Sequence, residues 1–283
     1  MAGRLTSRQT FELGIIGAGN MAEAIVGGLL RSCRMTGERI IVSDISPQRR
    51  QIFQTQFKAT AVDDNLAVAR QADVLLLSVK PQQMAAALAG IGGAATPRTL
   101  IVSIAAAIGT RFIEKHLGAD KPWRVVRAMP NTPMLLGEGT AAICRGTHAT
   151  PDDLATARKI FEAGAVVIET TEDKMDAVTA LSGSGPAYFF YLTEQLVKAG
   201  VELGLSAEDA KLLAAKTALG AAKMLMESEQ TPAELRRKVT SPGGTTEAAI
   251  AHLDAAKWGE AMVEAVKAAA RRSAELAKAQ GTL

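Results

Sequence analysis

The chain has 283 residues, enough for one large or two modest domains, and its 32 Lys plus Arg against 29 Asp plus Glu leave it nearly neutral. The basic residues are dispersed along the sequence, which argues against nucleic acid as a partner. Two cysteines, three histidines and no apolar run of roughly 20 residues argue against a disulfide framework, a zinc site and a membrane span, so we expect a cytoplasmic protein without a metal.

Short apolar runs alternate with helical patterns up to about residue 170. Strands that alternate with helices indicate a mostly parallel sheet covered on both faces, the doubly wound α/β class. Two of the runs, near residues 75 and 102, are apolar at successive positions, which predicts central strands buried from both sides. The seven predicted strands are Phe11–Ile16, Arg39–Ser43, Val74–Val79, Thr99–Ile104, Arg124–Met129, Thr140–Cys144 and Val166–Glu169.

A glycine-rich loop follows the first predicted strand and opens a helical pattern. In Gly17-x-Gly19-x-x-Ala22, the first glycine permits a tight turn and the second lets a pyrophosphate approach the backbone. Ala22 meets the third requirement, a small residue where helix and strand pack. Placed between a strand and a helix, the loop predicts a Rossmann-type dinucleotide-binding unit.

The second predicted strand ends in Ser43 and Asp44, where an acidic side chain would accept hydrogen bonds from the adenosine ribose of NADH and repel a 2′-phosphate. Arg49 and Arg50 follow in the next helical turn and have two interpretations. They could bind the 2′-phosphate of NADPH, or they could lie on a solvated helix face. The cofactor is therefore NADPH or NADH.

Two proline-containing strand exits lie farther along the chain, at Val79-Lys80-Pro81 and at Met129-Pro130-Asn131-Thr132-Pro133. Both are expected at the carboxyl edge of the sheet, where open sheets bind ligands, and there they would border the nicotinamide. The alternative is that these prolines only terminate strands.

Strand patterns stop after about residue 172, and four or five Ala- and Leu-rich helical stretches follow. Ser206 with Asp209, and Thr231-Pro232 with Glu234, are typical of helix N-termini. We therefore predict a Rossmann-type domain over residues 1–170 and an all-helical domain over residues 171–283.

The helical domain contains a stretch that is apolar all round, Ala187–Leu192, and three glycines within helical patterns, Gly200, Gly204 and Gly220. Close helix–helix approach would explain both features. Packing within one chain is the simpler account, but about a hundred residues bury such a helix poorly. We favour a helical interface between subunits.

The sequence Ser241-Pro-Gly243-Gly244-Thr245-Thr246 stands directly before another helical stretch. Its hydroxyl groups and backbone N–H donors could hold a small carboxylate at the helix N-terminus. Taken alone, the segment is more typical of an ordinary capped helix N-terminus than of a carboxylate site. Two other residues carry no predicted chemistry: Cys33 and Cys144 are expected to be small buried hydrophobic residues.

The chain resembles the pyrroline-5-carboxylate reductase family from Leu13 to about Leu276. The matching segments are 17–22 (Gly-Ala-Gly-Asn-Met-Ala), 78–82 (Ser-Val-Lys-Pro-Gln), 103–106 (Ser-Ile-Ala-Ala), 129–133 (Met-Pro-Asn-Thr-Pro), 180–188 (Ala-Leu-Ser-Gly-Ser-Gly-Pro-Ala-Tyr) and 232–254. The segments 180–188 and 232–254 are the most specific, because a generic dehydrogenase has no need of them.

The resemblance implies a Rossmann-type domain and a C-terminal helical domain that interlocks with a second copy, with dimers often assembled into decamers. It implies hydride transfer from NADPH or NADH to the C=N bond of 1-pyrroline-5-carboxylate, the last step of proline biosynthesis. A protonated imine accepts hydride readily, so positioning would supply most of the catalysis.

The same resemblance implies the site residues. Thr246 is the expected catalytic residue, contacting the imine nitrogen. The substrate-binding residues are Glu229, Ser241, Gly243, Gly244, Thr245 and Thr246. With the glycine loop and strand ends included, the cofactor-binding residues are Gly17, Gly19, Asn20, Met21, Ser43, Asp44, Asn65, Val79, Lys80, Pro81, Ala105, Met129, Asn131 and Pro133.

The chain departs from the family pattern at two places. Asp44-Ile45 stands where family members frequently carry a basic residue for the 2′-phosphate, and Ala107 stands where a glycine is usual.

Two other functions are weighed against pyrroline-5-carboxylate reduction. A related dehydrogenase or imine reductase would carry a catalytic Lys or Asp in the helix that starts at Gly185, and a non-catalytic nicotinamide-binding sensor could lack the 241–246 loop.

Overall fold

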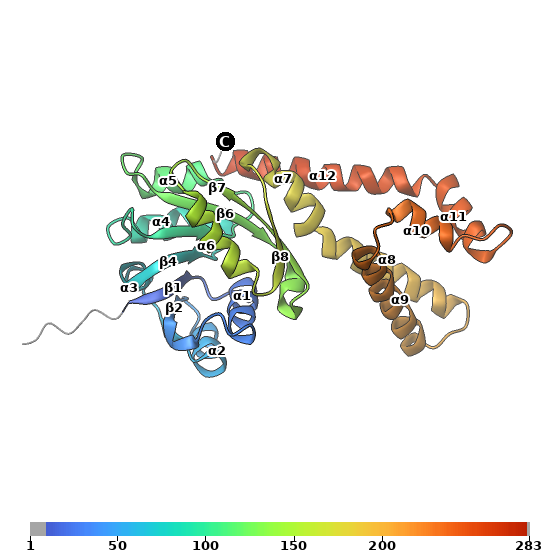
Figure 1. Ribbon diagram of the computed structural model, residues 1–283, viewed down its shortest axis with the longest axis horizontal. Helices are drawn as coiled ribbons and strands as arrows, with labels where there is room; N and C mark the ends of the chain where they lie inside the picture. Colours follow the sequence, from blue (N-terminus) through green and yellow to red (C-terminus); the bar gives the residue numbers. More distant parts are fainter. Residues whose placement is uncertain (1–9, 282–283) are drawn as a thin grey trace, which may run out of the picture. The chain divides into compact units, whose positions relative to one another are not determined.

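The computed structural model of the protein describes residues 10–281, which divide into two compact units. Unit 1 runs to Gly183 and resumes at Ala269, and unit 2 spans Ser184–Ala268. The strands of unit 1 are β1 (Phe11–Ile16), β2 (Ile40–Ser43), β3 (Thr60–Val62), β4 (Ala72–Leu77), β5 (Leu100–Ser103), β6 (Arg124–Pro130), β7 (Gly139–Arg145) and β8 (Ala165–Glu169). Its helices are α1 (Asn20–Arg31), α2 (Pro47–Phe57), α3 (Asn65–Gln71), α4 (Met84–Ile91), α5 (Thr110–Gly118), α6 (Pro151–Phe161) and α7 (Met175–Val178) (Figure 1).

The strands form a single sheet in the order β3-β2-β1-β4-β5-β6-β7-β8. Every neighbouring pair is parallel except β6 and β7, which are antiparallel. The prediction of a mostly parallel sheet is confirmed, and β4 and β5 are central strands as predicted. The sequence analysis missed β3, because Thr60–Val62 is only three residues long and has no fully buried residue.

The chain order reverses at β1, with β2 and β3 on one side and β4 on the other. Since β1, β2, β4, β5 and β6 are mutually parallel, their carboxyl ends lie at the same edge of the sheet. In open α/β sheets, ligands bind in the crevice at this edge where the strand order reverses. The loops after β1, β2 and β4 are thereby placed together.

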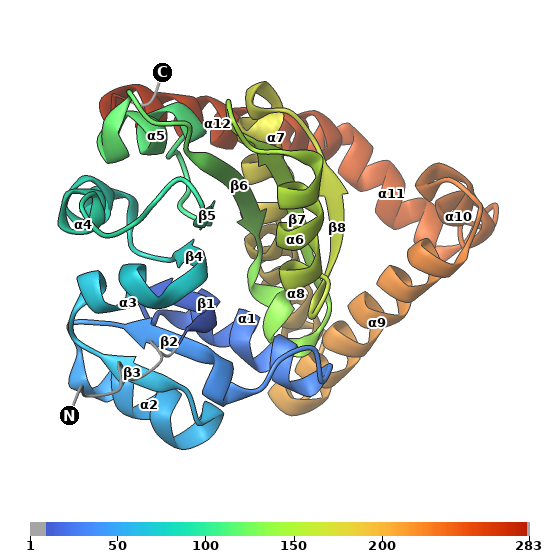
Figure 2. The same ribbon diagram turned by 60° about the vertical axis from the view of Figure 1, so that its left-hand side comes forward.

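Helices cover both faces of the sheet (Figure 2). Each face has its own apolar core. Ile25 of α1, Phe53 of α2 and Phe161 of α6 belong to one core. Leu88 of α4 and Phe112 of α5 belong to the other. The arrangement is the doubly wound α/β class that the alternation of strand and helix patterns predicted.

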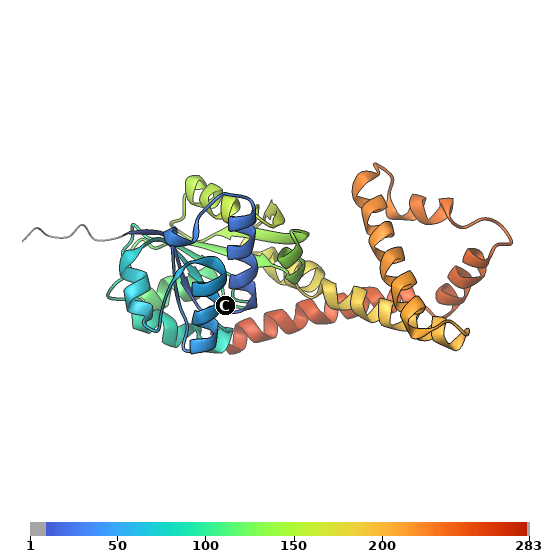
Figure 3. The same ribbon diagram turned by 90° about the horizontal axis from the view of Figure 1, so that it is seen from below.

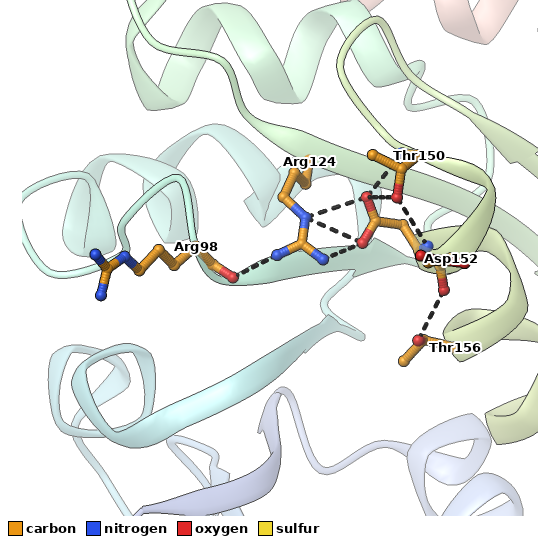
Figure 4. A network of polar contacts seen from close by, with 6 residues as sticks. Arg98, Arg124, Thr150, Asp152 and Thr156 are labelled. Carbon is orange, nitrogen blue, oxygen red and sulfur yellow. Dashed lines mark hydrogen bonds and ion pairs between the residues drawn. The ribbon is translucent and has the colours of Figure 1, made fainter.

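A polar network joins β6 to α6 (Figure 4). The carboxylate of the fully buried Asp153 pairs with the Arg124 guanidinium, whose Nη1 also donates to the Arg98 carbonyl oxygen at 2.7 Å. Asp153 also accepts the Thr150 N–H at 2.8 Å in a capping box that begins α6. Burial opposes ionisation of Asp153, but Arg124 and Thr150 outweigh burial and hold the pKa of this carboxyl below its usual range.

Unit 2 is entirely helical, and α8 and α9 form a helical hairpin (Figure 3). The Ser206 hydroxyl accepts the Asp209 N–H at 3.0 Å, and Thr231 and Glu234 form a capping box, so both predicted helix N-termini are confirmed. The helices are α8 (Gly185–Glu202), α9 (Ala207–Glu227), α10 (Pro232–Lys238), α11 (Thr245–Ala255) and the first part of α12 (Trp258–Ala279).

The three helix glycines differ in their surroundings. A Cβ on Gly200 would lie 3.0 Å from the Ala210 Cβ, so this glycine does mark the close approach of α8 and α9. Gly204 lies beyond the end of α8 with φ +94°, a left-handed helix terminus, and its placement inside a helix was wrong. Gly220 lies in α9, and a Cβ there would meet no atom within 4 Å apart from its own helix backbone.

The last strand ends at Glu169, while the compact units divide after Gly183 and again within α12. The domain boundary at residue 170/171 therefore stays a prediction. Within residues 10–281, no helix is both long and apolar enough to cross a membrane, and no cluster of three His, Cys, Asp or Glu side chains suits a metal ion.

Candidate active site

The glycine loop after β1 has the geometry that its first glycine was predicted to allow. Gly17 has φ +96°, and its N–H donates to the Ser43 carbonyl oxygen at 2.8 Å. A Cβ at this position would lie 2.7 Å from the Ser78 carbonyl oxygen, which is backbone and cannot swing away. Only glycine fits both the conformation and the close approach of β1 and β4.

The loop leads into the N-terminus of α1, where Gly19 is the N-cap and Asn20 and Met21 form the first residues of the helix. No side chain caps this end, and no atom lies within 4 Å of the place a Gly19 Cβ would occupy. An uncapped helix N-terminus with open space beside its glycine suits a bound phosphate group. These residues therefore fit a dinucleotide pyrophosphate.

At the end of β2, the Asp44 carboxylate joins two loops. One carboxylate oxygen accepts the Ala18 N–H and the other accepts the Ser46 N–H, each at 2.8 Å. Beside it, the buried Ser43 hydroxyl donates to Oδ1 of Asn65, the first residue of α3, at 2.7 Å. Ser43, Asp44 and Asn65 thus lie together beside the glycine loop, as a ribose site requires.

Arg49 and Arg50 both fold back toward this region. Arg49 donates from Nε to the Ala18 carbonyl oxygen and pairs through Nη2 with the Glu23 carboxylate at 2.7 Å. Arg50 donates from Nη1 to the Asp44 carbonyl oxygen at 2.7 Å. Both arginines are therefore partly exposed and hydrogen-bonded to neighbouring loops, and which of the two interpretations holds stays a prediction. The Arg49–Glu23 pair is one that the sequence analysis missed.

The exits of β4 and β5 lie next along the same edge. Val79 is half-buried, Lys80 is exposed and Pro81 begins a short 3₁₀ turn. The Ile104 N–H donates to the Leu77 carbonyl oxygen at 3.1 Å, which holds the segment leading into the buried Ala105 against β4. Both predicted segments therefore border the edge that carries the glycine loop.

The exit of β6 is held by the amide of Asn131, which is 8% exposed. Its Oδ1 accepts the Thr140 N–H at 2.9 Å and its Nδ2 donates to the Ser182 carbonyl oxygen at 3.0 Å. Met129 lies beside the same segment, since a Cβ on Gly183 would come within 2.6 Å of its Cε. Pro133 follows as the second residue of a 3₁₀ helix.

Ser182 and Gly183 belong to a single π-helical turn, residues Thr179–Gly183, that directly precedes α8. Such turns are rare and occur frequently at functional sites. The Asn131 side chain therefore fixes an irregular turn of the chain against the end of β6.

An ionic pair between a buried arginine and a partly exposed glutamate lies two residues before Met129. The Arg127 guanidinium, almost fully buried, pairs with Glu172, whose carboxylate also accepts the Thr110 hydroxyl at 3.0 Å. Burial, followed by the nearby Glu172 charge, raises the pKa of the adjacent Cys144 thiol to about 12. Cys144 is buried as predicted and stays a neutral thiol, whereas Cys33 is exposed and its predicted burial is wrong.

The predicted carboxylate loop lies in unit 2, ahead of α11. Gly243 has φ +72°, Gly244 is the N-cap, and Thr245 and Thr246 form the first turn of the helix. The Gly244 N–H donates to the Ser241 carbonyl oxygen at 3.0 Å, which closes the turn. Glu229 lies in the segment between α9 and α10 and is exposed.

One donor of this loop already has an anionic partner. The Gly243 N–H donates to the Glu247 carboxylate at 2.8 Å. Glu247 was missing from the predicted site residues. Its place at the third position of α11 is one from which acidic side chains commonly reach back to backbone N–H groups, and this spacing could have revealed it.

Comparison with known proteins gives two family matches. Residues 172–276 match the model of pyrroline-5-carboxylate reductase dimerisation, and residues 12–107 match that of coenzyme F420-dependent NADP oxidoreductases. A pyrroline-5-carboxylate reductase of Synechocystis sp. is 43% identical over 95% of this chain and 99% of its own length.

The chain belongs to the pyrroline-5-carboxylate reductase family.

Solved structures agree with that membership. A pyrroline-5-carboxylate reductase from Coxiella burnetii is 39% identical and superposes with a TM-score of 0.86 over 95% of this chain and 99% of its own. The pyrroline carboxylate reductase of Plasmodium falciparum, whose structure has NADP bound, is 28% identical, with a TM-score of 0.85 over 96% of this chain and 100% of its own. The predicted family and the predicted fold class are both confirmed.

Proposed function

We propose that the protein is an NAD(P)H-dependent pyrroline-5-carboxylate reductase that converts 1-pyrroline-5-carboxylate to L-proline. The observation that carries this function is the 43% identity to a reductase of that name over 95% of the chain. The glycine loop supports nicotinamide-dinucleotide binding, and the intact 241–246 loop supports binding of an acid substrate.

The residues of unit 1 would hold the dinucleotide along the carboxyl edge of the sheet. Gly17, Gly19, Asn20 and Met21 would receive the pyrophosphate on the N-terminus of α1. Ser43, Asp44 and Asn65 would line the ribose pocket. The remaining predicted residues would border the nicotinamide, and these are Val79, Lys80, Pro81, Ala105, Met129, Asn131 and Pro133.

The residues of unit 2 would hold the substrate. We assign the carboxylate to the Ser241 hydroxyl and to the backbone N–H groups of Gly243, Gly244 and Thr245, with Glu229 lining the pocket. A bound NADPH or NADH supplies the hydride that adds to the C=N carbon. The Thr246 hydroxyl would orient the ring nitrogen, which loses its positive charge as the double bond becomes a single bond and keeps its proton as the secondary amine forms.

A second copy of the chain is the partner that unit 2 fits. Three successive aromatic side chains of α8 are exposed in the single chain, at 65% for Phe189, 69% for Phe190 and 66% for Tyr191. Such a surface is typical of an obligate subunit interface. We propose a homodimer through the helical domain, assembled into decamers as the resemblance implies, and a cytoplasmic location.

The proposal is tested by giving the purified protein 1-pyrroline-5-carboxylate with NADH or NADPH and identifying proline as the product. Turnover to proline supports it. A related imine reductase would instead turn over other cyclic imines and leave this one unchanged. A non-catalytic sensor would bind the cofactor without turnover, and a Thr246→Val variant of such a protein would behave like the wild type.

A further inference from the structure

Four charged side chains surround the exit of β2. Arg49, at the third position of α2, crosses to the glycine loop, where its Nη2 pairs with Glu23 of α1 at 2.7 Å. The two side chains are 24% and 29% exposed, so the pair is largely shielded. Arg50 donates to the Asp44 carbonyl oxygen, and the Asp44 carboxylate accepts two backbone N–H groups.

These four groups carry two positive and two negative charges, and the charges cancel. In a Rossmann-type unit, the adenosine ribose lies at the end of the second strand. The ribose of NADH needs only an acceptor there, which Asp44 provides. The 2′-phosphate of NADPH instead needs an arginine that can present its planar guanidinium to phosphate oxygens.

The arginine best placed for that task is already engaged. Arg49 uses Nη2 for the Glu23 carboxylate and Nε for the Ala18 carbonyl oxygen. A phosphate would have to share or replace Glu23, and part of its attraction to Arg49 is cancelled by the carboxylate. The ribose hydroxyls of NADH make no such demand.

We infer that Glu23 sets the cofactor preference of this chain by holding Arg49 in an ion pair, which weakens recognition of the 2′-phosphate. Glu23 is a positioning residue here, because it acts through Arg49. This inference rests on the proposed function, namely that unit 1 binds a nicotinamide dinucleotide. It predicts that removing the Glu23 charge strengthens binding of 2′-phosphorylated nucleotides selectively.

The test is calorimetric titration of the full-length protein with 2′,5′-ADP and, separately, with 5′-AMP. These probes differ only in the 2′-phosphate and need neither substrate nor turnover. In the Glu23→Gln variant, we expect 2′,5′-ADP to bind about 5- to 10-fold more tightly and 5′-AMP to change by less than about twofold.

Two further variants separate Arg49 from general electrostatics. In an Arg49→Gln background, the Glu23→Gln change should no longer strengthen 2′,5′-ADP binding. Glu162→Gln serves as the matched control, since Glu162 also pairs with an arginine, Arg34, at 3.6 Å. This variant should leave the affinities for 2′,5′-ADP and 5′-AMP unchanged.

Several outcomes overturn the inference. Equal strengthening of both nucleotides would show a simple charge effect near the pyrophosphate, and a gain that persists without Arg49 would remove Arg49 from the account. If both probes bind but Glu23→Gln changes neither affinity, the inference alone fails. If neither probe binds the wild type, the dinucleotide site itself is wrong and the proposed function fails with it.

Discussion

If the 241–246 loop binds the substrate carboxylate as proposed, Glu247 would compete with the substrate for it, and removing the Glu247 charge should strengthen substrate binding. In the structure its carboxylate accepts the Gly243 N–H at 2.8 Å, and Gly243 is one of the donors proposed for the substrate carboxylate. An incoming anion would have to displace this contact and would also be repelled by the Glu247 charge. Glu247→Gln keeps the size and an acceptor oxygen while removing the charge.

The magnitude follows from the contact. An exposed, charge-assisted hydrogen bond contributes on the order of 1 kcal/mol, which corresponds to about a fivefold change in affinity. We therefore expect Glu247→Gln to lower the KM for 1-pyrroline-5-carboxylate about fivefold, with little change in the KM for the nicotinamide cofactor. Raising the ionic strength should reduce the difference between the two proteins, because exposed charges are screened.

The assay is initial-rate kinetics with substrate varied at saturating cofactor. Glu208→Gln is the matched control, because Glu208 is also an exposed acidic residue in the first turn of a helix, α9, with Ser206 as its N-cap. It should leave the KM unchanged. An unchanged or higher KM in Glu247→Gln, or an equal fall in the control, would refute the displacement argument.

Three other changes test the rest of the site and its support. Gly17→Ala forces a Cβ to 2.7 Å from the Ser78 carbonyl oxygen at φ +96°, so chemical denaturation should show a loss of roughly 2–5 kcal/mol, and an unchanged midpoint would contradict the geometry. In Asn131→Asp, a carboxylate oxygen replaces the amide nitrogen that donates to the Ser182 carbonyl oxygen at 3.0 Å, so two oxygens face each other. The same assay should show a loss of about 2–3 kcal/mol of stability. A variant as stable as the wild type would count against a role for the Asn131–Ser182 hydrogen bond. Asp153→Asn should cost about 1.5–3 kcal/mol at neutral pH, measured by urea unfolding. Because the pKa of Asp153 is lowered on folding, its contribution is present above the unfolded-state pKa and disappears as the pH falls through the folded value, so wild type and variant should converge in acid.

The fold was largely predictable because its signals are local. Val74 to Leu77 and Leu100 to Val102 are apolar at successive positions, and they form the central strands of the sheet. The helix N-termini at Ser206 and Thr231 were predictable because hydrogen bonds between residues three apart define them. The three-residue strand β3 has too few positions to establish a pattern.

The candidate site was predictable only in part. The spacing of the glycine loop predicts the turn at Gly17, because its positive φ is a conformation that residues other than glycine rarely adopt. The Arg49–Glu23 pair joins residues 26 positions apart on different helices, and no local pattern connects them. Cys33 looked like a core residue by type, but it follows α1 at φ 53°, in an exposed turn.

The central claim is hydride reduction of the C=N bond of 1-pyrroline-5-carboxylate by this chain. It is tested most directly by supplying the purified protein with substrate and NADPH deuterated at the transferred position of C4, and with NADH labelled in the same way. Mass spectrometry and NMR should find one deuterium in the proline product, on C5, the carbon that was doubly bonded to nitrogen. Proline without the label on C5, or no proline with either cofactor, would contradict the account.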